Sequence, residues 1–507
     1  MTYAPRLARM TETHRPFLYI LGIIVVVKIT LLITSQRYAD GDESVVGVMA
    51  LHILRNGDRP FYYWGQSYGG GGAIEAYFAA LLFRVFGVST IALKSVPLAF
   101  GIGAVVCCYA AVRSTVSERA GILAALFFAF SSGVVKLFTQ LGAGYVETPF
   151  FMFLIAYLIT RLRRATRPSV VLCGVGLVSG VGYYNQEQIL PFLACAGLYL
   201  VLVERSSLTI RSVALGALGL VVGLSPCLVY NFQNNLANFH DIAGATAFVP
   251  FADQSLDGIT RLFPAVFFPE NFNVYPGPLP ARTLLEAGLV LGIALSRLLA
   301  KGFWRTDRNI EWLWGGYLTS ELIWLLLNER TRVYPRYFLP VLPPMAVLLG
   351  VALSAGSLSR RLPVRRISVA LIGVVLSLGL YSHTAMLGDN AVFDFVGTSW
   401  GRQENLRVAG DDMVKAVALL RNRGIDAVRS PYFSQWRMIW ESEEAILASG
   451  SSLSPSKGRM DSFDEWVARS PNVAYVFHRD SVYSQEMAGS VSFERIAIGS
   501  YNVYIPN

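Results

Sequence analysis

The chain has 507 residues, of which 53% are apolar and only 15% are charged. Its mean hydropathy of +0.46 excludes an ordinary soluble globular protein and predicts a polytopic α-helical membrane protein. The formal net charge of +9 is carried largely by short basic connections between apolar segments, so it indicates membrane topology rather than nucleic-acid binding.

Apolar segments recur from the N-terminus to about residue 386, and we predict about eleven transmembrane helices there. The predicted spans are Pro16–Ser35, Thr90–Val112, Ala120–Phe138, Phe150–Thr160, Val170–Tyr184, Ile189–Val203, Ser212–Tyr230, Thr283–Leu299, Ile310–Leu327, Phe338–Ser354 and Ile367–His383. A span needs about 20 apolar residues, and several of these runs are shorter, so their limits are approximate. The first run has no small-residue cleavage site and is followed by further spans, which argues against a signal peptide.

Basic residues mark alternate connections between the spans. With the N-terminus on the cytoplasmic side, every cytoplasmic connection carries arginine or lysine, as at Arg113 and Arg361. This is the positive-inside pattern of a multi-pass protein of the plasma (inner) membrane. It places the loops 36–89 and 231–282, and everything after residue 384, on the outer face.

The first outer loop is predicted to be partly helical. Glu43–Arg55 and Ala73–Phe86 both have apolar residues at helical spacing, and the second helix is predicted to lie along the membrane interface. Between them, the aromatic run Pro60–Trp64 is typical of the headgroup level.

An acidic run, Asp40-Gly41-Asp42-Glu43, stands at the outer mouth of the first span. Ionised carboxylates cost roughly 2.5–3.5 kcal/mol each at a membrane helix centre, so acids kept near this depth indicate a function. Transfer of a group to a hydroxyl or amine needs a general base, and Asp42, Asp40 and Glu43 are the candidate catalytic residues. The structural alternative is that Asp42 caps the helix that follows it.

A glycine-rich stretch, Gln66–Gly72, precedes Glu75. Four consecutive glycines let the backbone approach a ligand or bend sharply. No Lys-Ser/Thr pair follows them, which excludes a nucleotide P-loop. A flexible turn is the alternative for the glycines, whereas Glu75 on an apolar helix is a candidate substrate contact.

Three later outer segments also carry polar groups. They are Gly144–Pro149 with Glu147, Tyr183–Gln188 with Gln186, and Glu329–Pro340 with Arg330, Arg332 and Arg336. Arginines on the outer side contradict the positive-inside trend, and their planar guanidinium groups bind phosphate well. Anchoring at the interface, or contact with lipid headgroups, is the alternative for each segment.

From residue 387 to residue 507 the charge density rises, and we predict a soluble α/β domain on the outer side. The predicted strands are Asp426–Phe433, Val473–His478 and Ser500–Ile505, and the predicted helices are Asp411–Arg423, Glu441–Ser449 and Ser462–Ser470. Residues 1–386 then form the transmembrane catalytic domain.

The five cysteines and five histidines show no metal-ligand or nucleophile spacing, so we interpret them as structural. The Asp-x-Asp spacing of the acidic run permits a divalent metal without requiring one, and no cofactor is predicted. Lys28 and Lys94, in or near predicted spans, are expected to snorkel towards the membrane surface.

Taken in order, these motifs resemble bacterial GT-C glycosyltransferases. The elements that carry the resemblance are Asp42-Glu43, Gly65–Gly70 with Glu75, Gly144–Glu147, Tyr183–Gln188 and Arg336–Pro340. The branch they resemble contains protein O-mannosyltransferases and lipid A aminoarabinose transferases. The resemblance covers the membrane region in order, and the α/β domain at the C-terminal end also fits it.

The resemblance implies an inverting transfer of a hexosyl or pentosyl group from a polyprenyl-phosphate carrier to an envelope lipid, glycan or protein. It implies Asp42 as the base, with Asp40 as the rival because the register is ambiguous. It further implies substrate contacts from Glu75, Tyr68, Glu147, Gln186, Arg332, Arg336 and Tyr337. Gly70–Gly72 replace a charged, proline-containing stretch of the aminoarabinose branch, so the substrate is left open.

Two other functions fit a polytopic chain. A lipid or sugar transporter would place charged groups near the membrane midplane and would show an internal repeat, whereas the polar groups here gather on the outer face. A glycan ligase or polymerase acting on polyprenyl-linked glycans is the second alternative. The transferase prediction depends on Asp42 and the outer arginines facing one pocket.

Overall fold

The computed structural model describes residues 4–35, 37–142, 144–245, 263–267, 279–299, 310–327, 335–395, 405–450 and 460–507. The chain divides into two compact units, each assembled from separate stretches of sequence. Unit 1 comprises Met1–Leu31, Pro97–Thr139 and Tyr145–Leu387, and unit 2 comprises Leu32–Val96, Gln140–Gly144 and Gly388–Asn507. The limits of the two compact units differ from those of the predicted catalytic and soluble domains. That division therefore stays a prediction about function.

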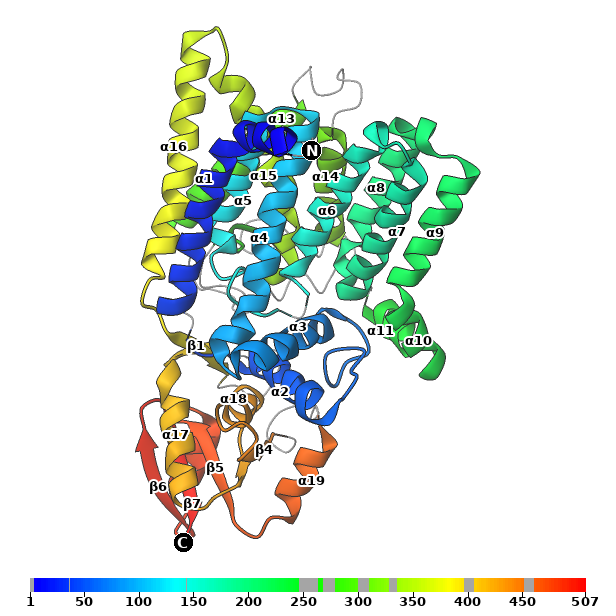
Figure 1. Cartoon of the computed structure of the whole chain (residues 1–507). Coiled ribbons are helices and arrows are strands. Elements are labelled where there is room, and N and C mark those ends of the chain that lie inside the picture. Colours follow the sequence, from blue (N-terminus) through cyan, green and yellow to red (C-terminus); the bar gives the residue numbers. More distant parts are fainter. Residues whose placement is uncertain are drawn as a thin grey trace. The chain divides into compact units, whose positions relative to one another are not determined.

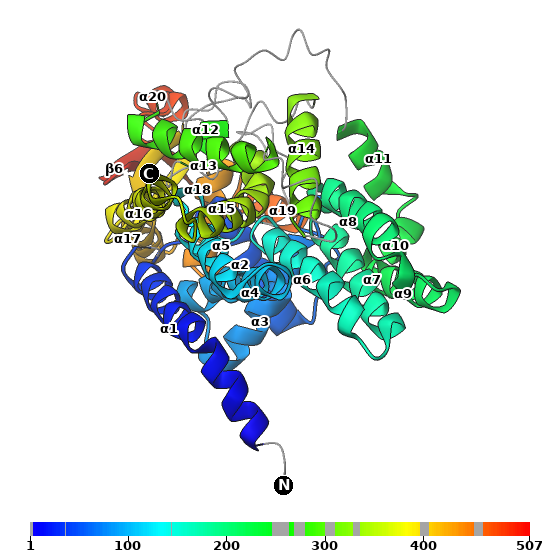
Figure 2. The same cartoon turned by 90° about the horizontal axis from the view of Figure 1, so that it is seen from above.

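Unit 1 is helical (Figure 1 and Figure 2). Its longer helices are α1 (Ala4–Ser35), α4 (Thr90–Thr115), α5 (Glu118–Phe130), α6 (Glu147–Arg161), α7 (Pro168–Asn185), α8 (Leu190–Val203), α9 (Ile210–Gly223), α10 (Ser225–Gln233), α11 (Ala237–Ala245), α13 (Ala281–Leu299), α14 (Glu311–Leu327), α15 (Leu342–Ser357) and α16 (Leu362–Ala385). Short helical turns are η1 (Ser132–Val134), η2 (Leu162–Arg164), η3 (Glu187–Ile189), η4 (Arg205–Ser207), α12 (Phe263–Ala265) and η9 (Pro335–Val341). The first residues of α4, and the last of α1, belong to unit 2.

Each of the eleven predicted spans coincides with a helix, but their number as complete spans is not confirmed. Among the described residues, four helical segments are long and apolar enough to cross a bilayer: His14–Ser35, Thr90–Thr115, Arg336–Ser357 and Leu362–Ala385. A fifth is reached if α9 and α10, which are bent by 57° at their junction, count as one span. The predicted span Ala120–Phe138 is helical only as far as Phe130.

Glycines let the helices α7 and α9 pack backbone to backbone. α7 and α9 lie side by side (Figure 1 and Figure 2). A Cβ atom at Gly180 would lie 2.5 Å from the carbonyl oxygen of Leu220, and one at Gly219 would overlap the carbonyl oxygen of Cys173. Close approach of this kind is how membrane helices gain van der Waals contact where lipid removes the hydrophobic driving force.

Lys28, expected to snorkel, is instead fully buried in unit 1. Its Nζ lies 2.7 Å from His383 Nε2 and 3.4 Å from the carbonyl oxygen of Val134, and it stands 4.2 Å from the centre of the Phe138 ring. The snorkelling prediction was wrong because polar partners on other helices satisfy the ammonium group inside the bundle.

Unit 2 contains two helices of the loop 36–89, α2 (Gly41–Asn56) and α3 (Gly71–Phe86), which confirms both predicted helices. Its C-terminal part contains β1 (Ala391–Phe395), β2 (Asn405–Ala409), α17 (Gly410–Asn422), β3 (Ala427–Arg429), α18 (Tyr432–Glu441), β4 (Leu447–Ser449), α19 (Asp461–Arg469), β5 (Val473–His478), α20 (Val482–Met487), β6 (Phe493–Ile498) and β7 (Tyr501–Pro506). The predicted mixed α/β architecture is confirmed.

The C-terminal strands form a five-stranded sheet in the order β4-β3-β5-β7-β6 and a separate hairpin of β1 and β2. β3 pairs in parallel with both β4 and β5, whereas β7 pairs antiparallel with β5 and β6. Two predicted elements were wrong here. The strand predicted to reach Phe433 ends at Arg429 and gives way to α18, and the helix predicted over Glu441–Ser449 is a turn followed by β4.

Candidate active site

The acidic run forms the first turn of α2. Asp40 is the N-cap: its Oδ1 accepts a hydrogen bond of 2.9 Å from the backbone N–H of Glu43, while Glu43 Oε2 accepts one of 3.0 Å from the N–H of Asp40. This reciprocal capping box fixes where the helix begins. The capping role considered for Asp42 therefore belongs to Asp40.

Glu43 is buried in unit 2, and both of its carboxylate oxygens accept hydrogen bonds. Its Oε2 also accepts a bond of 2.9 Å from Lys94 Nζ, and its Oε1 accepts one of 3.0 Å from the N–H of Leu141. Glu43 and Lys94 are 2% and 1% exposed, so this is a buried ion pair. The snorkelling prediction for Lys94 was wrong because its ammonium group faces a buried carboxylate.

Two glutamates hold the short segment 140–142 through its backbone. Besides the bond from Leu141 to Glu43, the N–H of Gly142 donates to Glu75 Oε1 at 3.0 Å. Glu75 is completely buried, and the side chain of Gln140 donates from Nε2 to Asp40 Oδ2 at 2.8 Å. Carboxylates that accept hydrogen bonds from backbone N–H groups hold a loop strongly, so these bonds fix the segment against the start of α2.

The surroundings of Asp40 destabilise the ionised form of its carboxyl group. Burial, followed by the nearby charges of Glu43 and Asp42, raises the pKa of Asp40 to about 7, although the bond from the Glu43 N–H and the charge of Lys94 oppose the shift. Asp40 is 6% exposed and both of its carboxylate oxygens accept hydrogen bonds. It is therefore held in place, and it titrates near neutral pH.

Asp42 differs from its two acidic neighbours because it is partly exposed. Its Oδ1 accepts a bond of 3.1 Å from the Tyr432 hydroxyl, and the Tyr63 hydroxyl lies 3.1 Å from its carbonyl oxygen and 3.4 Å from Oδ1. No hydrogen bond from a described residue reaches Oδ2. Asp42 is thus oriented through one oxygen and presents the other.

The glycine run has a packing role. Gly69 has a φ of +64°, the left-handed region that favours glycine, and a Cβ at Gly72 would lie 2.6 Å from the Tyr63 ring. The glycines thereby leave room for the tyrosine that contacts Asp42. Tyr68, a predicted substrate contact, is 38% exposed.

The other predicted site residues belong to unit 1. The guanidinium of Arg336 lies 5.7 Å from the centre of the Tyr145 ring and 5.5 Å from that of Tyr337, a cation–π arrangement. Glu147 is completely buried at the start of α6, and Gln186 is 8% exposed at the end of α7. Arg330 and Arg332 lie outside the described residues.

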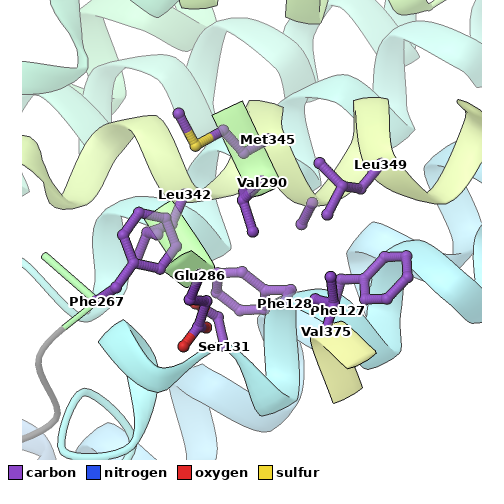
Figure 3. Close-up of a pocket in the computed structure, with 11 residues that line it drawn as sticks. Phe127, Phe128, Ser131, Phe267, Glu286, Val290, Leu342, Met345, Leu349 and Val375 are labelled. Carbon is purple, nitrogen blue, oxygen red and sulfur yellow. The ribbon is translucent and has the colours of Figure 1, made fainter. Parts of the chain in front are cut away.

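Figure 3 shows a cavity in unit 1 that is lined by Ser131, Glu286 and apolar side chains such as Phe128 and Met345. Its volume of about 20 Å³ suits roughly one water molecule and is too small for a sugar. Glu286 accepts bonds from both the N–H and the hydroxyl of Ser132, so its carboxylate has partners within the bundle. Within the described part of the chain, no group of three or more His, Cys, Asp or Glu side chains is arranged to hold a metal ion.

His52, near the end of α2, lies between two carboxylates. Its Nε2 is 2.6 Å from Glu444 Oε1 and its Nδ1 is 3.0 Å from Asp58 Oδ2, while Arg55 pairs with Glu443 at 2.6 Å. The hydrogen bond to Glu444 is the largest cause that raises the pKa of His52, and burial opposes it. This cluster, which we call the His52 clasp, joins α2 to the turn after α18.

Replacing His52 by glutamine is expected to lower the thermal unfolding midpoint mainly at acidic pH. A raised pKa in the folded state stabilises the protein fully below the ordinary value of 6.5, and this stabilisation disappears as pH rises through the folded-state pKa. We expect a loss of about 1–2 kcal/mol at pH 5.5 that shrinks towards pH 9. Unfolding scans in detergent from pH 5 to pH 9 measure it, with the exposed His240→Gln as control; a pH-independent difference would contradict the clasp.

Four residues of this site were not predicted from the sequence: Lys94, Gln140, Tyr63 and Tyr432. Lys94 alone had a usable signal, since a lone charge in an apolar run indicates a buried partner. The other three are common polar or aromatic residues, and nothing in their local sequence marks them.

Comparison with known proteins gives a family match over part of the chain and a fold. Residues 73–230 match the family described as dolichyl-phosphate-mannose-protein mannosyltransferase. No curated protein sequence matches the chain significantly.

Solved structures share the fold over nearly the whole chain. ArnT from Cupriavidus metallidurans, in the apo state, superposes with a TM-score of 0.64 at 12% identity, over 97% of this chain and 98% of that one. The oligosaccharyltransferase of Archaeoglobus fulgidus gives 0.55 at 13% identity, over 91% and 69%. The mycobacterial arabinofuranosyltransferase AftD gives 0.53 at 13% identity, over 97% of this chain and 40% of AftD. The predicted resemblance is thereby confirmed: the chain carries the sequence signature of that mannosyltransferase family over residues 73–230 and the GT-C glycosyltransferase fold of ArnT over nearly its full length.

Proposed function

We propose that this protein is an integral membrane glycosyltransferase that moves a sugar from a polyprenyl-phosphate carrier to an envelope acceptor, with inversion at the anomeric carbon. The observation that carries the proposal is Asp42, a partly exposed residue whose Oδ1 accepts a hydrogen bond from the Tyr432 hydroxyl and whose carbonyl oxygen accepts one from the Tyr63 hydroxyl. Asp42 belongs to a chain that has the fold of ArnT and carries a mannosyltransferase family signature.

The donor class is supported by what related structures contain. ArnT has been solved with undecaprenyl phosphate, and the archaeal oligosaccharyltransferase AglB with a dolichol-phosphate. Both ligands are polyprenyl phosphates, whose head groups lie at the depth of the lipid headgroups. The acceptor is a lipid, glycan or protein of the cell envelope, reached from the outer side of the plasma membrane.

The chemistry needs one base and one cationic site. Asp42 Oδ2 takes the proton of the acceptor hydroxyl or amine, whose lone pair attacks the anomeric carbon. The bond from that carbon to the phosphate oxygen breaks on the opposite face, so the configuration inverts and the carrier phosphate leaves with its electron pair. Arg336, supported by Tyr337, stabilises the charge on the departing phosphate, together with Arg332.

The remaining acidic residues have other roles in this proposal. Asp40 and Glu43 shape the first turn of α2, because all of their carboxylate oxygens accept hydrogen bonds from the protein. Glu75 fixes segment 140–142, and Glu147, Gln186 and Tyr68 are kept as substrate contacts. Asp42 belongs to unit 2 and Arg336 to unit 1.

A transfer assay tests the function. The purified full-length chain, reconstituted in liposomes with envelope extract, is given radiolabelled polyprenyl-phosphate sugars, beginning with mannose. We expect the label to appear in an acceptor fraction with an equal amount of free carrier phosphate. Movement of intact labelled lipid between leaflets without release of carrier phosphate would indicate a transporter, and lengthening of a polyprenyl-linked glycan would indicate a polymerase.

A further inference from the structure

Within unit 2, α18 of the C-terminal part packs against α2, and the two helices run in the same direction. Contacts at three levels show this. Tyr432 at the start of α18 bonds to Asp42 at the start of α2, Trp440 packs at Gly47 in the middle, and Glu444 beyond the end of α18 bonds to His52.

Small residues on α2 make this close packing possible. A Cβ at Gly41 would lie 2.7 Å from the Cα of Phe433, and a Cβ at Gly47 would lie 2.5 Å from the Trp440 ring. The Trp440 indole also donates to Thr90 Oγ1 at 3.2 Å, at the start of α4. The position of α18 along α2 is therefore fixed by backbone contact, by a hydrogen bond and by the His52 clasp.

Tyr432 is the principal donor to the Asp42 carboxylate. A tyrosine hydroxyl has one proton to donate, and the nearer acceptor of the Tyr63 hydroxyl is the carbonyl oxygen of Asp42, at 3.1 Å against 3.4 Å for Oδ1. Tyr432 reaches Oδ1 at 3.1 Å and lies 3.4 Å from the Tyr63 hydroxyl. Tyr63 thus steadies the backbone and Tyr432 the side chain.

We propose that Tyr432 is a positioning residue, through which the C-terminal domain orients the catalytic base Asp42. The inference rests on the proposed function and extends it to a domain that begins more than 340 residues after Asp42 in the chain. The hydrogen bond restricts rotation of the carboxylate and leaves Oδ2 for the acceptor.

Replacing Tyr432 by phenylalanine tests the role. In the transfer assay we expect kcat to fall about 10- to 100-fold, which corresponds to the loss of one hydrogen bond to a charged group, with KM within about twofold of the wild-type value. A purely structural role would lower the amount of folded enzyme, measured by its unfolding midpoint, and would leave kcat per folded molecule and KM unchanged.

Matched variants separate the possible outcomes. Tyr63→Phe should lower kcat less, and Tyr483→Phe, which removes a hydroxyl elsewhere in the same domain, should leave kcat and KM unchanged. If Asp42→Asn is inactive while Tyr432→Phe keeps the wild-type kcat, the inference is overturned and the proposed function stands. If Asp42→Asn keeps its activity, the assignment of the base fails first, and the role of Tyr432 fails with it.

Discussion

Replacing Asp42 by asparagine is expected to reduce sugar transfer by about 10²–10⁴-fold, the usual contribution of a general base. Asparagine keeps the shape of the side chain and can still accept a hydrogen bond from Tyr432, so the fold should survive. What is lost is the oxygen that takes the acceptor proton. Initial rates with a saturating labelled polyprenyl-phosphate sugar measure the effect, and thermal unfolding verifies that the variant is folded.

Asp40→Asn is the decisive comparison for this prediction. Asparagine is a good N-cap and can still accept from the Glu43 N–H, so α2 should begin at the same place. We expect transfer to stay within about tenfold of wild type, because Asp40 acts on the helix and not on the acceptor. A severe loss in Asp40→Asn together with an active Asp42→Asn would reverse the assignment and make Asp40, whose pKa is raised to about 7, the base.

Lys94→Met is expected to be the most destabilising single substitution near the acidic run, at about 3–5 kcal/mol. It removes the ammonium group that lies 2.9 Å from Glu43 Oε2 and leaves a buried carboxylate without its counter-charge. Glu43 also caps α2 and holds the N–H of Leu141, so the damage should extend to segment 140–142. The thermal unfolding midpoint of the full chain in detergent measures the loss.

Two variants control the ion-pair argument. Lys415→Met removes an exposed lysine that pairs with Asp411 on the surface of α17, and it should leave the thermal unfolding midpoint nearly unchanged. Adding Glu43→Gln to Lys94→Met should restore part of the lost stability, because no unpaired charge then stays buried. Equal unfolding midpoints for Lys94→Met and Lys415→Met would show that the buried pair contributes little.

Two predicted elements failed for a reason that is visible in the C-terminal sheet. Residues 441–449 have a helix-favouring composition, but Glu443 and Glu444 adopt positive φ values of +49° and +69° and turn the chain. Leu447 to Ser449 then pair in parallel with β3, so strand pairing overrides local propensity. Likewise Pro431 stands directly before α18, whose first residue, Tyr432, bonds to Asp42.

The amino-acid sequence by itself determined the elements whose signal is local. The apolar runs predicted where helices lie, helical spacing predicted α2 and α3, and the acidic run together with the later motifs predicted the glycosyltransferase resemblance. Only the tertiary structure decided which side chains contact the acidic residues. Lys94 meets Glu43 across 51 residues, Gln140 meets Asp40 across 100, and Tyr432 meets Asp42 across 390. Such contacts depend on how distant segments pack, and no local periodicity of apolar or charged residues records that packing.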